Sequence, residues 1–150
     1  MIRKYAQKDL PECAGLLVAA YNNEQWKGRW SFQDACSCLL EFVGEPRFVG
    51  YVLEADGKIA AAAFAKERTC DNGSELFVED FFVDPAFQRK GFGTALLGAL
   101  EDHVRENGLE GITLLTNRFL PSSDFYRKHG FSEAGHVQFL YKVLPKPEGR

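Results

Sequence analysis

The sequence predicts an α/β protein built around one mixed sheet. Helical and strand patterns alternate along the chain in the order β-α-α-β-β-β-α-β-α-β-β. The length of 150 residues is that of a single domain, and neither a repeat nor a linker-like stretch divides it. Hydrophobic residues make up 45% and charged residues 26%, as is ordinary for a globular protein. We therefore expect one domain over residues 1–150, with a loose tail at 145–150.

The first third of the chain has the pattern of one short strand followed by two helices. Residues 2–5 have the composition of a strand, and Asp9 follows as a candidate helix cap. Apolar residues recur at helical spacing over residues 10–21, which predicts a helix with one buried stripe. Ser31 begins a second helical pattern, which ends at Gly44.

Three strands and a long helix are predicted in the middle of the chain. Residues 48–54 and 59–66 flank the Asp-Gly pair at 56–57, which is typical of a tight hairpin turn. Residues 75–83 form the third strand, and their apolar end is typical of a central position in a sheet. A helix over residues 91–107 follows after a short loop.

The last part of the chain is predicted to add strands on either side of a brief helix. Residues 112–116 form a β-branched run that fits a parallel strand reached by a crossover. Ser122 or Ser123 caps a helix that runs to His129. Two final strands are expected, at residues 131–134 and 138–144.

Composition excludes several classes of function. A net charge of −3 and a pI near 5.6 argue against nucleic acid as the main partner. The sequence has no apolar run of about 18 residues to predict a membrane helix, and its start lacks the apolar stretch of a secretory signal. The cysteines have neither Cys-x-x-Cys spacing nor a nearby His pair, which predicts reduced thiols in a cytoplasmic protein and no metal site. These cysteines are Cys13, Cys36, Cys38 and Cys70.

A glycine-rich loop between the third strand and the following helix carries the clearest chemical signal. Residues 88–94 read Gln-Arg-Lys-Gly-Phe-Gly-Thr. The first backbone N–H groups of a helix lack partners within it, and the helix dipole adds positive charge there. Gly91 and Gly93 let the backbone approach a diphosphate closely, while Arg89 and Lys90 add charge beside it. We therefore expect this loop to bind phosphate.

Three known phosphate-binding patterns compete for this loop. The P-loop pattern has its lysine after the glycines, whereas Lys90 precedes them. The dinucleotide pattern has a small residue three positions after Gly93, where Leu96 stands. The third pattern, Gln88-x-x-Gly91-x-Gly93, resembles the pyrophosphate loop of the GNAT superfamily of acetyl-CoA-dependent N-acetyltransferases.

Two further stretches strengthen the resemblance. Phe81-Phe-Val-Asp-Pro85 is similar to the central strand of the family and to its step into the loop. Phe125-Tyr-Arg-Lys-His-Gly-Phe131 is similar to the late helix of the family. The order of elements over nearly the whole chain is also that of the family. The resemblance implies a GNAT-like, mostly antiparallel twisted sheet with a splayed central strand pair and about four flanking helices.

The resemblance also implies that the chain binds acetyl-CoA as a cosubstrate. In the family the pantetheine arm lies between two splayed strands, where unpaired backbone groups can bond to its amides. The implied pantetheine contacts are the backbone groups of Phe81, Phe82 and Val83. The implied pyrophosphate contacts are Gln88, Arg89, Lys90, Gly91, Phe92, Gly93 and Thr94, and Asn117 and Ser123 are further implied contacts to the cofactor.

Acidic residues cluster before the loop, with five acids and neither Lys nor Arg between Asp71 and Asp84. In a regular strand Glu79 and Asp80 point to opposite faces, so one of them is expected to face the cleft. A carboxylate there is a candidate base that takes a proton from an amine, directly or through water. Glu79 resembles the position of the base in several family members, and Asp80 is the alternative.

Aromatic residues supply the remaining candidates. The resemblance assigns Tyr126 as the acid that protonates the departing CoA thiolate, because a tyrosine of ordinary pKa near 10 is protonated at neutral pH. Trp26 and Trp30, together with Glu79, are candidate acceptor contacts, since this region shapes the acceptor pocket in the family. Core packing is the alternative for all three aromatic residues. The histidines are expected to be structural: His103, His129 and His136.

The predicted function is that of a cytoplasmic N-acetyltransferase acting on a primary amine by direct attack in a ternary complex. The acid-rich strand favours a cationic small molecule as acceptor, such as a polyamine, an amino sugar or an aminoglycoside. A peptide or protein amine is the alternative acceptor. A non-catalytic acyl-CoA-binding module is the alternative from another class. We expect neither nucleic acid nor membrane as a partner, and because family members are often dimers, a homodimer stays open.

Overall fold

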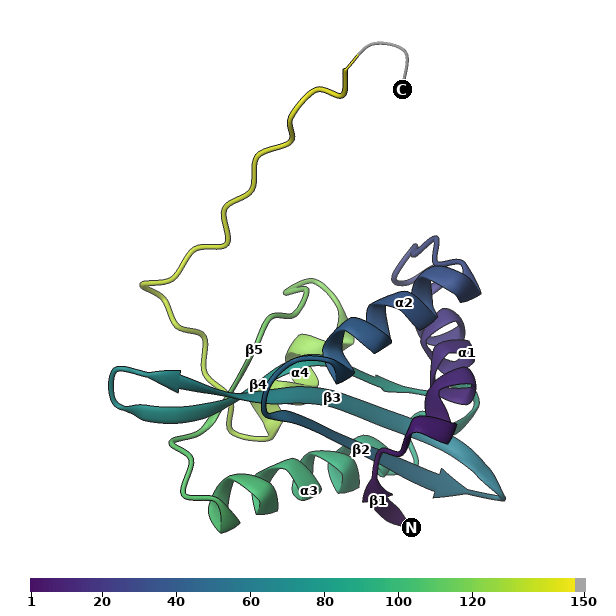
Figure 1. The fold of residues 1–150 in the computed structure, drawn as a ribbon, viewed down its shortest axis with the longest axis horizontal. Coiled ribbons are helices and arrows are strands. Elements are labelled where there is room, and N and C mark those ends of the chain that lie inside the picture. Colours follow the sequence, from purple (N-terminus) through teal and green to yellow (C-terminus); the bar gives the residue numbers. More distant parts are fainter. Residues whose placement is uncertain (148–150) are drawn as a thin grey trace. The chain divides into compact units, whose positions relative to one another are not determined.

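The computed structural model describes residues 1–147, and Figure 1 shows their arrangement. The strands are β1 (Ile2–Lys4), β2 (Phe48–Ala55), β3 (Lys58–Cys70), β4 (Gly73–Val83) and β5 (Ile112–Leu114). The α-helices are α1 (Leu10–Tyr21), α2 (Phe32–Val43), α3 (Phe92–Glu106) and α4 (Pro121–Lys128). Two short 3-10 helices are η1 (Gln7–Asp9) and η2 (Pro85–Phe87). The described residues form two compact units, Met1–Thr116 and residues 117–147.

The first unit is an open sheet of five strands in the order β1-β2-β3-β4-β5. Neighbouring strands are antiparallel from β1 to β4, whereas β5 is parallel to β4 and is reached by a crossover through α3. Helices α1 and α2 lie over one face of the sheet and α3 lies over the other (Figure 1). The mixed, mostly antiparallel sheet with four helices is thus confirmed for the described residues.

An aromatic cluster fills the core between the sheet and the α1/α2 layer. Phe64 of β3 is fully buried at its centre. Its ring centroid lies 5.2 Å from that of Tyr5, 6.0 Å from that of Phe48 and 6.1 Å from that of Phe82. Because these rings come from three strands and the segment after β1, the cluster fixes the register of the sheet on this face.

The opposite face of the sheet buries one stripe of α3. Leu96, Leu97 and Leu100 form this stripe and are almost completely inaccessible to solvent. The stripe fixes the start of α3 next to the loop that follows β4. Helix α3 has 15 residues, and no helix within residues 1–147 is both long enough and apolar enough to cross a bilayer.

The N-cap that the sequence predicts is present at α2 but absent at α1. Ser31 accepts a 3.0 Å hydrogen bond from the backbone N–H of Asp34, as expected for an N-cap. The side chain of Asp9 does not cap α1. Its carboxylate accepts hydrogen bonds from the Arg3 guanidinium at 2.7 and 2.9 Å and from the backbone N–H of Ala6 at 2.8 Å. The buried carboxylate of Asp9 therefore links β1 to η1 and does not cap α1.

The second unit differs from the sequence prediction in two respects. Helix α4 begins at Pro121 after Leu120, so neither Ser122 nor Ser123 caps it. The strands predicted at 131–134 and 138–144 are absent from the described residues. An alternating pattern becomes a strand only when a neighbouring strand supplies backbone partners, and this unit contains none. The expected tail at 145–150 is extended without regular structure over 145–147, and residues 148–150 lie outside the described part.

Candidate functional site

A β-bulge in β4 sets the direction of the two candidate bases. Phe64 of β3 pairs with Asp80, but the next residue, Ala65, pairs with Val78, so Glu79 is an extra residue in β4. A bulge of this kind interrupts the alternation of side chains along the strand. Residues of β4 on either side of Glu79 consequently change face relative to a regular strand.

Both acids therefore reach the face of the sheet that α1 and α2 cover. Asp80 accepts a 2.6 Å hydrogen bond from the hydroxyl of Tyr21, which ends α1. Glu79 contacts Lys66, which shares the face of Phe64 in the alternation of β3. The expectation that Glu79 and Asp80 point to opposite faces is wrong, because it assumed a regular strand.

Glu79 lies in a small cluster of charges that links three parts of the chain. Its Oε1 is 3.2 Å from the Nζ of Lys66, which also contacts Glu45 at 2.5 Å. The Glu79 side chain is only 10% exposed. Its second oxygen, Oε2, is buried and has no hydrogen-bond partner within residues 1–147. A buried carboxylate oxygen without a donor is costly unless it has a proton or a ligand to bond.

The cluster makes Glu79 a better proton acceptor than an exposed glutamate. Burial raises the pKa of Glu79, the Lys66 ammonium lowers it, and a hydrogen bond from protonated Glu79 to Glu45 raises it again. We infer a net upward shift because burial is the largest of these effects. In contrast, the ion pair with Lys66 lowers the pKa of Glu45. The pKa of Glu79 is therefore higher than that of Glu45, so a proton that binds to this pair of carboxylates is carried by Glu79.

Asp80 is held more rigidly than Glu79. Its Oδ1 accepts the Tyr21 hydroxyl and also the backbone N–H of Phe81, at 3.1 Å. Burial raises the pKa of Asp80 to about 6, even though both hydrogen bonds favour the carboxylate. With its Oδ1 occupied by two donors, Asp80 is a weaker candidate base than Glu79 and a stronger candidate for holding Tyr21.

The pairing of β4 with β5 ends where the acids begin. β5 pairs with Leu76, Phe77 and Val78, and β4 continues to Val83 without β5 beside it in the ladder. Backbone groups of a strand that has lost its neighbour can pair with an amide-bearing ligand. The β4–β5 ladder therefore stops before residues 79–83, as a splayed strand pair would require.

The loop after β4 turns the chain sharply into α3. The buried ring of Phe87 packs on that of Phe92, with centroids 5.7 Å apart, and anchors the loop from below. Arg89 and Gly91 have φ of 66° and 81°, so the backbone is left-handed on both sides of Lys90. Space is open around Gly91, but its φ strains any residue with a Cβ.

The start of α3 offers donors and positive charge together. The first hydrogen bond within the helix runs from Ala95 N–H to Gly91 C=O, so the N–H groups of Phe92 and Gly93 point out of the helix end. Arg89 and Lys90 are exposed, and neither forms an ion pair with a carboxylate of residues 1–147. The loop thus fits a multiply charged phosphate ligand.

The two tryptophans occupy different environments in the α1–α2 loop. The Trp26 ring packs edge-on against that of Tyr21, with ring centroids 5.2 Å apart, and the hydroxyl of Tyr21 bonds Asp80. Trp30 is partly buried against the aromatic core. Asn22 shapes the loop, because its side chain bonds both the N–H and the C=O of Trp30, at 2.9 and 2.8 Å. Trp26 thus contacts the tyrosine that bonds Asp80.

In the second unit the three remaining candidates belong to α4 and the turn before it. Asn117 accepts the backbone N–H of Phe119 at 2.9 Å, which is the contact of a turn-forming residue. Ser123 is buried, and its backbone N–H bonds to Leu120. Tyr126 is 8% exposed, with its ring packed between Phe125 and Phe131.

The other titratable candidates have structural surroundings. His103 of α3 lies 2.7 Å from the carboxylate of Glu67 on β3. Burial raises the pKa of Cys13 to about 12 and that of Cys38 to about 11, so both are unreactive thiols. Within residues 1–147, no three His, Cys, Asp or Glu side chains converge as a metal site would require.

Sequence reasoning missed three residues of the site: Tyr21, Glu45 and Lys66. Tyr21 belongs to the helical stripe and is indistinguishable there from a packing residue. Glu45 and Lys66 are far from Glu79 in the sequence and meet it only through the bulge and the β3–β4 register. No local signal in the sequence identifies the last two.

Comparison with known proteins adds an independent line of evidence. A model of the acetyltransferase (GNAT) family matches residues 8–131. The ribosomal protein bS18-alanine N-acetyltransferase of Escherichia coli is 30% identical over 135 residues, which are 89% of this chain and 84% of that protein. Streptothricin acetyltransferase A of Bacillus subtilis is 28% identical over an alignment 144 positions long, which covers 87% of this chain and 79% of that protein.

Solved structures show the same fold. One, described as a possible acetyltransferase from Clostridium difficile 630, has a TM-score of 0.80 at 18% identity and covers 97% of this chain and 98% of that one. Another, the aminoglycoside acetyltransferase AAC(6')-Iy with a bisubstrate analogue, has a TM-score of 0.74 at 23% identity and covers 96% and 98%. At these identities the likeness is one of fold.

The raised pKa of Asp80 predicts how stability depends on pH. Between an ordinary aspartate pKa and about 6, the folded state binds more protons at this residue than the unfolded state. The contribution of Asp80 to the free energy of unfolding therefore falls as pH rises through this window. Replacing Asp80→Asn removes that dependence. The variant should gain stability relative to the wild type from pH 4 to 7, by at most about 3 kcal/mol.

Urea unfolding at several pH values measures this difference. The exposed residue Asp102 supplies the control, since Asp102→Asn removes a carboxylate of the same kind from the surface of α3. A difference between Asp80→Asn and wild type that stays constant from pH 4 to 7 would contradict the buried, proton-binding role of Asp80.

Proposed function

Because the chain belongs to the acetyltransferase (GNAT) family, we propose that this N-acetyltransferase transfers the acetyl group of acetyl-CoA to a primary amine of a cationic small molecule. The observation that carries the proposal is the buried, unpartnered Oε2 of Glu79. It lies on β4 where the strand parts from β5, and a proton acceptor is needed where an amine attacks a thioester. The reaction takes place in the cytoplasm, and residues 1–150 act as one domain.

The binding of acetyl-CoA divides between β4 and the start of α3. The pantetheine amides pair with the backbone of Phe81, Phe82 and Val83, beyond the last ladder pair with β5. The pyrophosphate binds the N–H groups at the start of α3, flanked by Arg89 and Lys90. Further contacts to this ligand come from Gln88, Gly91, Phe92, Gly93, Thr94, Asn117 and Ser123.

Glu79 is the proposed base, and its neighbours prepare it. The acceptor amine loses a proton to Glu79, directly or through water, and its lone pair attacks the acetyl carbonyl carbon. Protonated Glu79 is then stabilised by its hydrogen bond to Glu45, while Lys66 holds both side chains in place. The C–S bond breaks as the new C–N bond is completed, and Tyr126 protonates the departing thiolate.

A cationic small molecule is the acceptor class that the charges support best. Glu79, Asp80 and Glu45 gather on one face of the sheet, with Lys66 as the single cation bound among them. Trp26, which packs on Tyr21, offers a ring face to which a cation can bind, and Trp30 of the same loop is the second candidate contact. The similarity to a streptothricin acetyltransferase and to the fold of an aminoglycoside acetyltransferase supports the same class.

A peptide amine is the second candidate acceptor, because the relative at 30% identity is an alanine N-acetyltransferase of a ribosomal protein. An assay of acetyl-CoA consumption against a panel of amines separates the candidates. We expect turnover with aminoglycosides or polyamines to exceed that with alanine-initiated peptides by at least tenfold. The reverse preference would transfer the proposal to peptides, and no consumption with any amine would favour a non-catalytic acyl-CoA-binding module.

Replacing Glu79→Gln should lower the rate most at low pH. The variant cannot accept the amine proton, so at pH 7 we expect a loss of about 10² to 10³ in kcat/KM. The loss should shrink above about pH 9, where more of the acceptor is already the free amine. A pH–rate profile with a good acceptor measures both limits. A loss that does not depend on pH would mean that Glu79 binds the acceptor without serving as base.

The matched control is Glu45→Gln. It removes the carboxylate that raises the pKa of Glu79 and leaves Lys66 in place. The acidic limb of the rate profile should then move to lower pH, with the plateau rate within a factor of about three.

Replacing Tyr126→Phe should keep acetyl-CoA affinity and reduce turnover by about 10² to 10⁴, since only the hydroxyl is lost. The buried ring keeps its packing on Phe125 and Phe131, so the helix is preserved. Calorimetry with acetyl-CoA and steady-state kinetics measure the two quantities. Wild-type turnover, with an acceptor for which chemistry limits the rate, would remove Tyr126 as the acid.

A further inference from the structure

Tyr21 joins three parts of the first unit at one side chain. It is the last residue of α1, and its ring centroid lies 5.2 Å from that of Trp26 and 6.2 Å from that of Phe82 on β4. Its hydroxyl donates a 2.6 Å hydrogen bond to Oδ1 of Asp80 and lies 3.5 Å from the carbonyl oxygen of Phe81. The end of α1, the α1–α2 loop and the bulged strand therefore meet at this tyrosine.

Asp80 gives this hydroxyl a fixed partner. It follows the bulge in β4 and pairs with Phe64, the buried centre of the aromatic core. Its Oδ1 also accepts the backbone N–H of Phe81 at 3.1 Å, so the carboxylate is held by its own strand. A hydrogen bond to an ionised acceptor is roughly twice as strong as one between neutral groups. The Tyr21 hydroxyl is thus anchored to the sheet.

The α1–α2 loop forms its other hydrogen bonds locally. Within residues 1–147, the hydrogen bonds of residues 22–30 run to one another or to the last turn of α1. The carbonyl oxygen of Tyr21 accepts the N–H groups of Asn23 and Gly28, at 3.0 and 2.8 Å, and so closes the loop on the end of α1. Trp30 packs against the core, but the polar link from this part of the chain to β4 is the hydroxyl of Tyr21.

The contacts of Tyr21 favour a role in positioning over a role in proton transfer. Its hydroxyl donates to Asp80, and the unpartnered oxygen that the proposed base requires belongs to Glu79. Loop segments with few buried contacts open locally at little cost in free energy. The loss of one anchoring bond should therefore loosen Trp26 without unfolding the protein.

We propose that Tyr21 is a specificity-determining positioning residue, whose hydroxyl bond to Asp80 holds Trp26 in place for the acceptor. The inference rests on the proposed acetyl transfer and deepens it, since it names the group that fixes the acceptor surface. A ring that is already fixed loses little conformational entropy when an acceptor binds, so its release weakens binding. Attack on the thioester proceeds at the same rate once the acceptor is bound. Tyr21 thus acts on acceptor KM and not on kcat.

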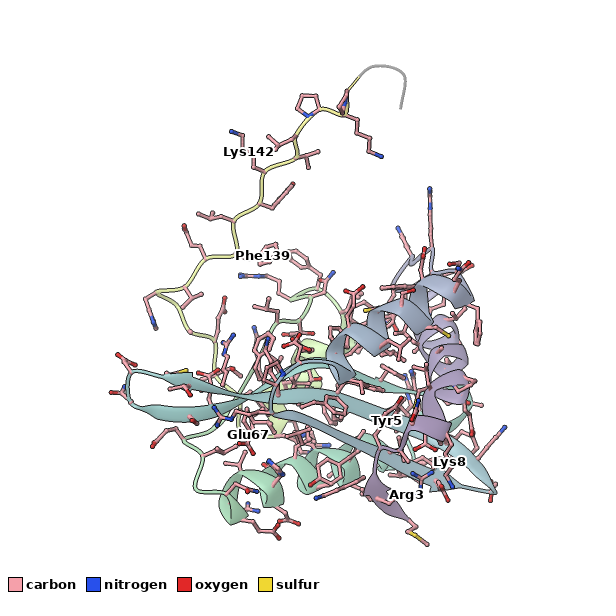
Figure 2. The ribbon with its side chains drawn as sticks, viewed as in Figure 1. Arg3, Tyr5, Lys8, Glu67, Phe139 and Lys142 are labelled. Carbon is pink, nitrogen blue, oxygen red and sulfur yellow. The ribbon has the colours of Figure 1, made fainter. Side chains whose placement is uncertain are left out.

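Replacing Tyr21→Phe keeps the ring and removes only the hydroxyl. With saturating acetyl-CoA and the best amine of the panel, we expect acceptor KM to rise about tenfold, while kcat and the KM for acetyl-CoA stay within a factor of about three. Tyr51→Phe is the matched control. The Tyr51 hydroxyl lies 3.4 Å from Nδ1 of His103, whose Nε2 bonds Glu67 on the α3 side of the sheet (Figure 2). Circular dichroism verifies that both variants are folded, and the control should keep wild-type constants.

Hydrogen exchange follows the loop without any substrate. Four amides of the loop are hydrogen-bonded within it or to the end of α1, those of Trp26, Lys27, Gly28 and Trp30. In Tyr21→Phe they should exchange at least threefold faster than in the wild type and in Tyr51→Phe, whereas the amides of β3 should not change. Loop amides that keep the wild-type rate would overturn the anchoring role of the hydroxyl.

A double-mutant cycle separates positioning from direct contact with the acceptor. Trp26→Ala alone should raise acceptor KM at least as much as Tyr21→Phe does, and adding Tyr21→Phe to it should change KM by less than about twofold. Additive effects would overturn the proposal, as would an unchanged acceptor KM or a loss confined to kcat. A lack of acetyl-CoA consumption with every amine would overturn the proposed function itself, whereas turnover without these KM effects would overturn this inference alone.

Discussion

The extra residue in β4 is the constraint on which the placement of Glu79 and Asp80 depends. A regular strand would direct Glu79 and Asp80 to opposite faces, and one of them would lie under α3 among leucines. The bulge brings both to the α1/α2 face, where Glu79 forms an ion pair with Lys66 and Asp80 accepts a hydrogen bond from Tyr21. The same position marks the end of the β4–β5 ladder. One local irregularity therefore directs both acids to one face and coincides with the point at which the β4 backbone loses β5 as its neighbour.

Most of the architecture could be predicted from the sequence because its signals are local. The Ser31 cap, the Asp-Gly hairpin at 56–57 and the helix after the glycine-rich loop each depend on a few neighbouring residues, and each is confirmed. The glycine-rich loop belongs to the same class, since its conformation requires glycine at position 91. The resemblance drawn from these pieces is confirmed by the family match.

The features that could not be predicted all depend on contacts between distant residues. The Glu45–Lys66–Glu79 cluster joins the turn before β2 to two strands, and only the register of β3 against β4 brings it together. Asp9 has the sequence of a cap, but Arg3 competes for its carboxylate with a bidentate pair. The two final strands are absent from the described residues for a related reason, because strand propensity carries no information about whether a neighbouring strand is present.

In the α1–α2 loop, the residues that hold the backbone in place are not those whose side chains face solvent. The Asn22 side chain closes the loop on the backbone of Trp30, and Gly28 fits because a Cβ there would come within 2.8 Å of the Tyr21 carbonyl oxygen. The exposed side chains at Glu24, Gln25, Lys27 and Arg29 contribute little to that closure. Mutations at these four positions can therefore accumulate at small cost in stability, so the surface of the loop can change while its backbone path stays fixed.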